Sequence, residues 1–429
     1  MNPHRPGEDP YRWTILAIMG FLFFITNFAE FQLAGVVGSL SSALHLDPME
    51  FGICLFAPFL MNFVFGIPVG MLADRFGTRA VGSVLLLVSS AGIIGRAYAS
   101  SGFLSLFGWM LVFGFAMVFI NALGPKILGN WFKPAQMTLA MGVFIASAGL
   151  GIGFGEATAP LFASLRGMFT LGWVLSAIST GWFLAAFRAK PPGQPDPPPQ
   201  RVLEFLGTAA RNRHVWIAGV ASLFCFSAVV ATSGDLPGAL VQVKHASPIQ
   251  AGLLGIPLGL GAALGCSVVP MILRRLPGIK AWLASVVMMG AALLLAALAV
   301  PFGPMTWVCV ILGTLLANGL LTFTLPFPIM LREIGTTYGG SAGGIVSLLQ
   351  TGGGFFIPSF AIALVAGTNP RTTFAVIFAL YLISAVLVLF LPERGFRHAE
   401  SSGSEWSTSI DGNAALTHVP AAFNENEIQ

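Results

Sequence analysis

Long apolar runs dominate this sequence, and they restrict the fold more than any other feature does. A bilayer-spanning helix needs roughly 20 mainly apolar residues. Twelve stretches meet that length, over residues 13–42, 50–72, 80–99, 103–127, 137–162, 168–187, 214–241, 248–272, 281–300, 305–330, 341–366 and 372–391. Only 9% of the residues are charged, against about 25% in soluble domains. Because lipid offers the backbone no hydrogen bonds, the chain is predicted to be an all-α integral membrane protein.

The charges and the cysteines argue against several other classes of protein. The basic residues lie at the ends of segments and form no patch, so no nucleic-acid partner is expected. Neither H-E-x-x-H, C-x-x-C nor a nucleophile elbow occurs, which ranks a membrane enzyme last, and no cofactor is expected. The four cysteines lie inside apolar segments without metal-ligand spacing, so no metal site is assigned: Cys54, Cys225, Cys266 and Cys309.

Lysines and arginines predict how the chain sits in its membrane. An even number of spans places both termini on one side, taken here as the cytoplasm. Sixteen of the 21 Lys and Arg residues then face inward, and Lys126 lies within or at the inner end of the fourth span. The four that face outward are Arg96, Arg166, Lys244 and Arg371. This bias follows the positive-inside rule. The expected location is a bacterial inner membrane or an internal membrane derived from it, and the protein is expected to be a monomer.

Two short stretches of the chain resemble each other at an offset of 200 residues. HLDPMEFG occupies residues 45–52 and HASPIQAG occupies residues 245–252. The stretches 71–75 and 271–275 match at the same offset. Spans 1–6 and 7–12 are therefore predicted to be two copies of one six-helix unit in the same orientation. Two such units leave a cavity between them, and rocking opens it to each side in turn, which implies a transporter.

The same pattern divides the chain into five parts. They are a cytoplasmic N-terminus over 1–12, an N-terminal six-helix bundle over 13–187, a linker over 188–213, a C-terminal six-helix bundle over 214–391 and a tail over 392–429. The linker is rich in proline and basic residues and is expected to be cytoplasmic. The tail is polar and aperiodic and is predicted to be disordered.

A motif at the inner end of the second span identifies a family. The stretch from Gly70 to Arg79 reads GMLADRFGTR and resembles the G-x-L-A-D-R-x-G-[RK]-[RK] motif of the major facilitator superfamily. The matching residues are Gly70, Leu72, Ala73, Asp74, Arg75, Gly77 and Arg79. With the six-plus-six spans over 13–391, the resemblance implies the major facilitator fold.

The resemblance also implies a role for the motif as a cytoplasmic latch. In the family the aspartate pairs with a base near the inner end of span 4 and with the start of span 11. Here Lys126 or Lys133 is the candidate partner of Asp74, and Lys126 has a snorkelling position as its alternative. The second copy has Arg274 where the first has Asp74, so the second latch is expected to be degraded.

Glycine-rich runs in spans 5 and 11 point to one branch of that family. They resemble the paired runs of nitrate/nitrite porters, and the region around Asp235 resembles that branch and the cyanate-type permeases. The glycines are Gly149, Gly151, Gly153, Gly155, Gly352, Gly353 and Gly354. Spans 2 and 8 lack the mid-span arginines that grip the anion in those porters, and the runs lack the family's asparagine. Close helix packing is the alternative role of the glycines.

Polar residues inside the predicted spans are the candidate substrate or coupling-ion site. Carboxylates are expensive in lipid and usually face a cavity, where they bind a cation or carry a proton. The acids are Glu30, Glu156 and Asp235, in spans 1, 5 and 7, which the resemblance implies line the central cavity. Mouth-facing positions are the alternative for Glu156 and Asp235, and an internal hydrogen bond to Asn27 is the alternative for Glu30. The neutral candidates, which could instead join helices, are Asn27, Gln32, Asn62, Asn121, Asn318 and Gln350.

These residues predict a secondary active transporter that works by alternating access. We expect a small solute, an inorganic ion, with proton coupling, because buried acids outnumber buried bases. Transport of a metal cation such as iron is the alternative within the same fold. A sensor or assembly protein that keeps the fold but moves no solute is the alternative of another class, and solute flux distinguishes the two.

Overall fold

The protein is a bundle of helices, described here from a computed structural model. The structure describes residues 9–99, 102–191, 207, 209–273, 278–324, 327–331, 335–367 and 369–392. Within these ranges, twelve helical segments are long and apolar enough to cross a membrane. This confirms the predicted fold class. The predicted linker and tail lie largely outside the described residues, as do Arg274 and Arg275 of the second motif copy.

The first six spans form the N-terminal half. They are α1 (Tyr11–Gly35), α3 (Pro48–Phe76), α4 (Thr78–Gly95), α5 (Phe103–Trp131), α6 (Pro134–Thr158) and α7 (Leu165–Ala186). Shorter helices extend or join them: α2 (Val37–Leu44), η1 (Arg96–Tyr98) and η2 (Ala159–Leu161).

The last six spans form the C-terminal half, and three of them are interrupted. The unbroken ones are α9 (Arg213–Lys244), α12 (Ile279–Ala299) and α18 (Pro370–Leu389). The broken ones are α10 (Pro248–Leu253) with α11 (Gly255–Leu273), α13 (Pro304–Asn318) with α14 (Leu321–Thr324), and α16 (Gly335–Phe356) with the π-helical turn η3 (Ile357–Ile362) and α17 (Ala363–Ala366). A further short helix, α15 (Phe327–Met330), precedes α16.

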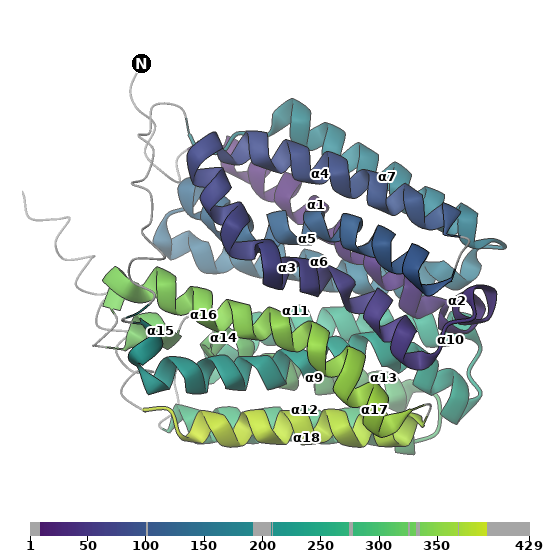
Figure 1. The fold of residues 1–429 in the computed structure, drawn as a ribbon. Helices are drawn as coiled ribbons and strands as arrows, with labels where there is room; N and C mark the ends of the chain where they lie inside the picture. Colours follow the sequence, from purple (N-terminus) through teal and green to yellow (C-terminus); the bar gives the residue numbers. More distant parts are fainter. Residues whose placement is uncertain are drawn as a thin grey trace, which may run out of the picture.

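Each half has its own apolar core. One buried cluster fills the C-terminal half and one fills the N-terminal half. A third lies toward the end of the N-terminal half that carries His45 and also includes Val230 of α9 and Phe355 of α16. Equivalent helices pack on each other in both halves: α1 packs on α6 as α9 packs on α16, and α3 packs on α5 as α11 packs on α13. In Figure 1 the purple-to-blue half lies against the teal-to-yellow half, with α3, α6, α11 and α16 along the boundary.

The repeated stretches are turns that start a helix with the same chemistry in each half. His45 and His245 end the preceding helix in the left-handed conformation, with φ of 54° and 52°. Asp47 and Ser247 then cap the next helix in a capping box, in which the side chain three residues later, Glu50 or Gln250, bonds back to the cap. The similarity therefore reflects one structural solution used twice. The end of the bundle that carries these turns is called the His45 end.

The opposite end is called the Asp74 end. There the start of α1 meets the ends of α5 and α7, because Tyr11 donates to the carbonyl oxygen of Ala186 at 2.5 Å and Trp131 to that of Arg188 at 3.1 Å. Lys280 at the start of α12 likewise donates to the carbonyl oxygen of Leu389, at 3.0 Å. The ends of neighbouring spans therefore lie at the same level of the bundle in each half.

Contacts between the halves gather toward the His45 end. The Ser359 hydroxyl donates to the carbonyl oxygen of Gly52 at 3.3 Å. Deeper in, the ring centroids of Phe59 and Phe226 lie 5.5 Å apart. Toward the Asp74 end, large apolar side chains of α3, α6 and α11 are exposed: Phe65, Met71, Leu72, Leu139, Leu264 and Met271. The halves are therefore joined at the His45 end in this conformation.

Candidate functional site

Glu30 lies in the interior of the N-terminal half, near the end of α1. Its side chain is fully buried, and neither carboxyl oxygen has a hydrogen-bond partner among the described residues. A charge in such a place is costly unless it is paired. The Asn27 amide, which was the expected local partner, donates to the carbonyl oxygen of Phe23 at 2.9 Å, within its own helix. Glu30 therefore has no internal hydrogen bond of the kind that the alternative role requires.

Arg96 is buried in the same half, and sequence reasoning missed it. Its side chain is 1% exposed, although its position at the end of the third span suggested an outward-facing residue. The guanidinium donates to the carbonyl oxygen of Ala29 at 2.6 Å and lies over the rings of Phe113 and Phe169, at 5.1 and 4.9 Å from their centroids. Its positive charge acts on Glu30, but no ion pair within 4.0 Å joins the two in the described structure.

Two things make this position suitable for arginine. Aromatic faces attract a guanidinium, and the attraction grows when water is excluded. The carbonyl next to Glu30 in the chain, that of Ala29, is bonded by Arg96, so the base is fixed close to the acid. One further nitrogen, Nη2 of Arg96, has no partner in the described structure. A lone basic residue after a glycine-rich apolar run, GIIGRAY over 92–98, was the only signal in the sequence.

Glu156 lies on the boundary between the two halves. It is near the end of α6, is fully buried, and neither of its carboxyl oxygens has a hydrogen-bond partner in the described part of the chain. A side chain at Gly255 of α11 would collide with its carboxyl group, and one at Gly35 or Gly252 would collide with its backbone. In this conformation the carboxyl group of Glu156 is enclosed, so it does not occupy the mouth-facing position that was its alternative.

Asp235, the third acid, differs from the other two because it is only half-buried. It lies on α9 two residues before Pro237, and its neighbour Gly234 packs against Leu55 and Phe56 of α3. Asp235 thus also lies close to the boundary between the halves, on the opposite side of it from Glu30.

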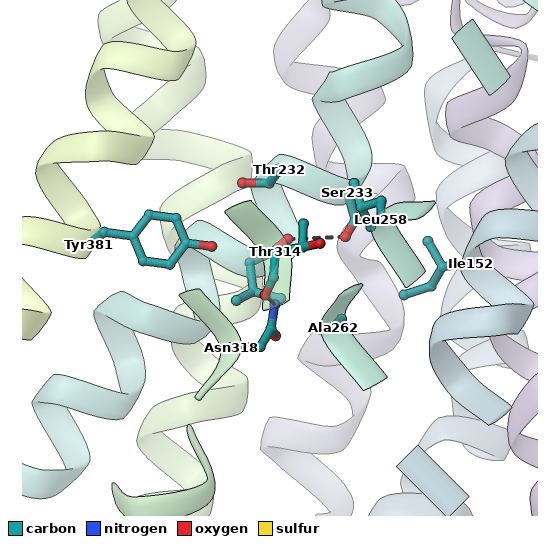
Figure 2. Close-up of a pocket in the computed structure, with 9 residues that line it drawn as sticks. Ile152, Thr232, Ser233, Leu258, Ala262, Thr314, Asn318 and Tyr381 are labelled. Carbon is teal, nitrogen blue, oxygen red and sulfur yellow. Dashed lines mark hydrogen bonds between the residues drawn. The ribbon is translucent and has the colours of Figure 1, made fainter. Parts of the chain in front are cut away.

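A small polar cavity lies in the C-terminal half and reaches the boundary at Ile152 of α6. Its volume is about 30 Å³, enough for one or two water molecules. Figure 2 shows polar side chains from three spans pointing into it. They are Thr232 and Ser233 of α9, Thr314 and Asn318 of α13, and Tyr381 of α18. Only Asn318 among them was predicted from the sequence.

Four of the five polar side chains that line this cavity donate a proton within their own helices. Thr232, Ser233 and Thr314 donate to carbonyl oxygens one turn earlier in their own helices, at 2.7, 3.1 and 2.8 Å. The Asn318 amide donates to the carbonyl oxygen of Thr314 at 2.8 Å. The oxygens of these side chains remain as acceptors. Two further neutral candidates, Asn121 and Gln350, are half-buried on α5 and α16 and do not line this cavity.

The motif at the Asp74 end joins α3 to α5 and α4 to α7. Asp74 forms an ion pair with Lys126 of α5, and their side chains are 23% and 35% exposed. Arg79 donates to the carbonyl oxygen of Leu184 in α7 at 2.7 Å, and Gly77 makes the turn between α3 and α4 with φ of 87°. Of the two candidate partners of Asp74, Lys126 is thus the one in contact, while Lys133 is the N-cap residue of α6. Gly70 faces open space, and Arg75 lies over Phe76.

The glycine-rich runs allow helices to approach each other closely. Side chains at Gly149 and Gly153 would collide with the backbone of α11, and those at Gly151 and Gly155 with the backbone of α1. Gly353 approaches the backbone of α9, and Gly352 and Gly354 approach the rings of Phe63 and Phe226. These contacts are the packing role that the sequence left open as an alternative.

In the residues that the structure describes, no three His, Cys, Asp or Glu side chains lie close enough to hold a metal ion. His45 and His245 belong to the two turns.

Several proteins of known family resemble the chain. A probable nitrate/nitrite transporter, NarK2, of Mycobacterium tuberculosis is 27% identical over 349 residues, which are 78% of this chain and 85% of the relative. A probable nitrate/nitrite antiporter, NarK1, of Thermus thermophilus is 25% identical over 90% of this chain and 92% of its own length.

Similar solved structures support the fold, and a family model identifies the family. A bacterial homolog of the human lysosomal transporter Spinster, solved in an inward-facing and unoccupied conformation, superposes with a TM-score of 0.67 at 17% identity, over 93% of this chain and 99% of its own. The same homolog in an inward-facing and occupied conformation gives 0.68 at 15% identity, over 92% of this chain and 98% of its own. The family model of the Major Facilitator Superfamily matches residues 16–358. The chain therefore belongs to the Major Facilitator Superfamily and is a multi-pass membrane transporter, not an enzyme.

Proposed function

We propose that the protein moves a small inorganic ion by alternating access and couples that movement to protons through Glu30. The enclosed carboxyl group of Glu30 carries the proposal, since neither of its oxygens has a hydrogen-bond partner in the described structure. Arg96 acts on it electrostatically without an ion pair. A buried carboxyl whose charge is only partly compensated takes up or releases a proton when its hydration changes. The helix that carries Glu30, α1, also contacts α9 and α10 of the other half, so movement of the halves would change that hydration.

Two observations support a small inorganic solute. The relatives named above are described as nitrate/nitrite transporters. The cavity in the C-terminal half has a volume of about 30 Å³ and a ring of oxygen acceptors. A small cavity with a polar lining of this kind suits a small hydrophilic solute.

Two kinds of ion are candidates for the transported solute, an oxyanion and a metal cation. An oxyanion is favoured by the relatives, although the described part of span 2 carries an arginine only near its end, at Arg75, and α11 has none. A metal cation is favoured by the excess of buried acid, because Glu30 and Glu156 are fully buried whereas Arg96 is the one fully buried base of the described chain. The oxyanion is the first candidate, and both enter the test.

The orientation belongs to the same proposal. The excess of lysine and arginine at the Asp74 end supports a cytoplasmic position for that end and for both termini. The halves are joined at the His45 end, through contacts such as that between Ser359 and Gly52. The conformation described here is then one that faces inward.

The test is solute uptake into proteoliposomes that enclose a pH-sensitive dye. The panel contains nitrate, nitrite, cyanate, ferrous iron and small carboxylates, and protein-free liposomes give the background. We expect one solute to enter together with a change of internal pH. In Glu30→Gln the pH change should be lost while solute binding, followed by thermal shift, remains.

A matched control separates this effect from general damage. Glu50→Gln also removes one carboxylate, but the second capping box uses Gln250 at the equivalent position, so flux should stay at the wild-type level. Solute flux without proton movement in the wild type would refute the coupling. Binding without any flux would replace the transporter by the sensor of the same fold.

A further inference from the structure

We propose that Glu156 is a proton-binding seal between the two halves, closed when its carboxyl group is neutral and opened when that group is ionised. The inference rests on the proposed rocking of the halves, but not on the substrate or on Glu30. It assigns to Glu156 a task separate from coupling, namely to make the His45 end sensitive to the pH of the compartment that it faces.

The position of Glu156 is the first argument. Its carboxyl group touches Gly255 of α11, and its backbone touches Gly252 of α10, both from the C-terminal half. On its other side, its backbone touches Gly35 of α1. The acid is thus clamped between elements of both halves, and separating the halves at the His45 end must expose it to water.

The chemistry of the surroundings is the second argument. Gly255, which offers the carboxyl group no side chain, lies directly against it, and neither of its oxygens has a partner among the described residues. An ionised carboxylate is strongly disfavoured in such a slot. A neutral carboxyl group costs far less to bury. Protonation of Glu156 therefore favours closure of the two halves at the His45 end, and closure favours protonation.

Among the described residues, the helices packed against α6 place no positive charge where it would neutralise an ionised Glu156. The elements packed against α6 are α1, α5, α10, α11 and η2. Of these, α10, α11 and η2 carry no charged residue, and Cys266 is their titratable group. In α1 the charged residues are Glu30 and Arg12, and in α5 the one lysine, Lys126, is paired with Asp74 at the opposite end.

The direction of the effect follows from linkage. The closed His45 end binds one more proton than the open one, so low pH favours closure and high pH favours opening. Because the acid is enclosed when that end is closed, its proton returns to the same side on opening. Glu156 therefore adjusts when the gate opens without carrying a proton across the membrane, and this distinguishes it from Glu30.

The experiment measures gate opening directly. Spin labels are attached to cysteines at Leu161 of η2 and Ile249 of α10, which are 62% and 42% exposed and belong to the two halves. The full chain, with its four native cysteines replaced, is reconstituted in nanodiscs without substrate. Distances between the labels are recorded by pulsed electron resonance from pH 5 to pH 9.

We expect the long-distance, open population to grow with pH, by up to about tenfold per pH unit within the titration range of one proton. Glu156→Gln should remain closed, with less than about a twofold change across the range. Glu156→Asp keeps a carboxyl group and should keep the pH dependence. Glu50→Gln, which removes a carboxylate outside the seal and keeps an amide that can complete the capping box, should behave like the wild type.

Two results would overturn the proposal. One is a wild-type distance distribution that does not depend on pH, and the other is a Glu156→Gln variant that keeps the wild-type dependence. If Glu156→Gln does not fold, Gly255→Ala supplies the test, because the added methyl group presses on the carboxyl group. It should raise the open population at every pH, and an unchanged population would again overturn the seal. None of these results depends on flux, so failure of the seal and failure of the proposed transport are distinguishable.

Discussion

Arg96 and Glu30 are two opposite charges that share the interior of the N-terminal half without forming an ion pair. The guanidinium is held by the Ala29 carbonyl and by the two rings of Phe113 and Phe169. A planar guanidinium suits such a stacked position better than an ammonium group does. Glu30 is left free of direct bonds, in the field of a fixed cation, so its proton affinity can respond to a change in hydration.

The effects of substituting Arg96 and Glu30 on the free energy of unfolding should therefore depend on each other. Arg96→Met removes a buried charged hydrogen bond, and we expect a cost of about 2 kcal/mol, in part because Glu30 loses its compensating charge. Glu30→Gln on its own should cost less. In the double variant the loss should be smaller than the sum of the two single losses. Thermal unfolding in detergent measures the cycle.

A surface arginine is the control for this cycle. Arg166 lies over the ring of Tyr98 and is exposed, so Arg166→Met should shift the unfolding midpoint little and should add independently to Glu30→Gln. Strict additivity of Arg96→Met and Glu30→Gln would show that the two buried charges do not act on each other.

At the scale of helices, the motif at the Asp74 end fastens α3 to its neighbours. The pair between Asp74 and Lys126 is partly exposed, so its contribution to stability is small, about 0.2 to 1 kcal/mol. Its position matters more than its strength, because it joins the ends of two spans of the N-terminal half that must move as one unit when the halves rock. The Arg79 contact with α7 acts at the same end.

We expect Asp74→Asn to slow transport several-fold while solute binding and the unfolding midpoint stay close to those of the wild type. Lys126→Gln should have the same effect, and the double variant should be no slower than either single variant, because one bond is lost in all three. Uptake rates and thermal shifts with the transported solute measure this. A loss of binding in a well-folded Asp74→Asn variant would place Asp74 in the solute site.

The approach of α6 to α11 gives a second expectation at this scale. Gly153→Ala places a methyl group against the backbone at Gly255, so the halves cannot close fully at the His45 end, and uptake should fall at least about tenfold. Gly181→Ala in α7 meets nothing within 4 Å and should leave uptake unchanged, with a slight gain in helix stability. Equal uptake in the two variants would mean that this approach is not needed in the transport cycle.

The helices were predictable from the sequence for a simple physical reason. Length and hydropathy determine what can span a bilayer, and the twelve expected stretches correspond to the twelve spans with ends that differ by a few residues. The breaks were not predictable in this way. Val36 interrupts the first span, Leu254 the eighth, and the π-helical turn at 357–362 the eleventh, because such breaks depend on what the neighbouring helices satisfy.

The candidate site was predictable only in part. Acids within apolar runs stand out, so Glu30 and Glu156 were found. Arg96 was missed because a base at the end of a span normally reaches toward water, and its burial depends on rings contributed by α5 and α7. The hydroxyl groups of Thr232, Thr314 and Tyr381 were missed because such residues usually bond within their own helix, and only the fold brings them together.

For the whole molecule, the important feature is that the two halves meet along a seam that is tight toward the His45 end. Glycine faces of α6 and α11 form one side of that seam, and aromatic contacts such as Phe59 with Phe226 form the other. Alternating access requires such a seam to open without unfolding either half. Two of the three buried clusters each lie within one half, and the third crosses the seam through Val230 and Phe355. Rigid-body rocking therefore opens packing at that crossing and leaves most of the packing inside each half in place.

A disulfide across the seam tests this directly. Gly52 of α3 and Ser359 of η3 belong to different halves, and a Cβ at Gly52 would lie 3.6 Å from the Cα of Ser359, which suits a disulfide. In a background without native cysteines, Gly52→Cys with Ser359→Cys should transport when reduced and stop when oxidised. Reductant should restore the transport rate, and the oxidant should not change the transport rate of either single variant. Continued transport after complete cross-linking, verified by mass spectrometry, would mean that the His45 end does not open in the cycle.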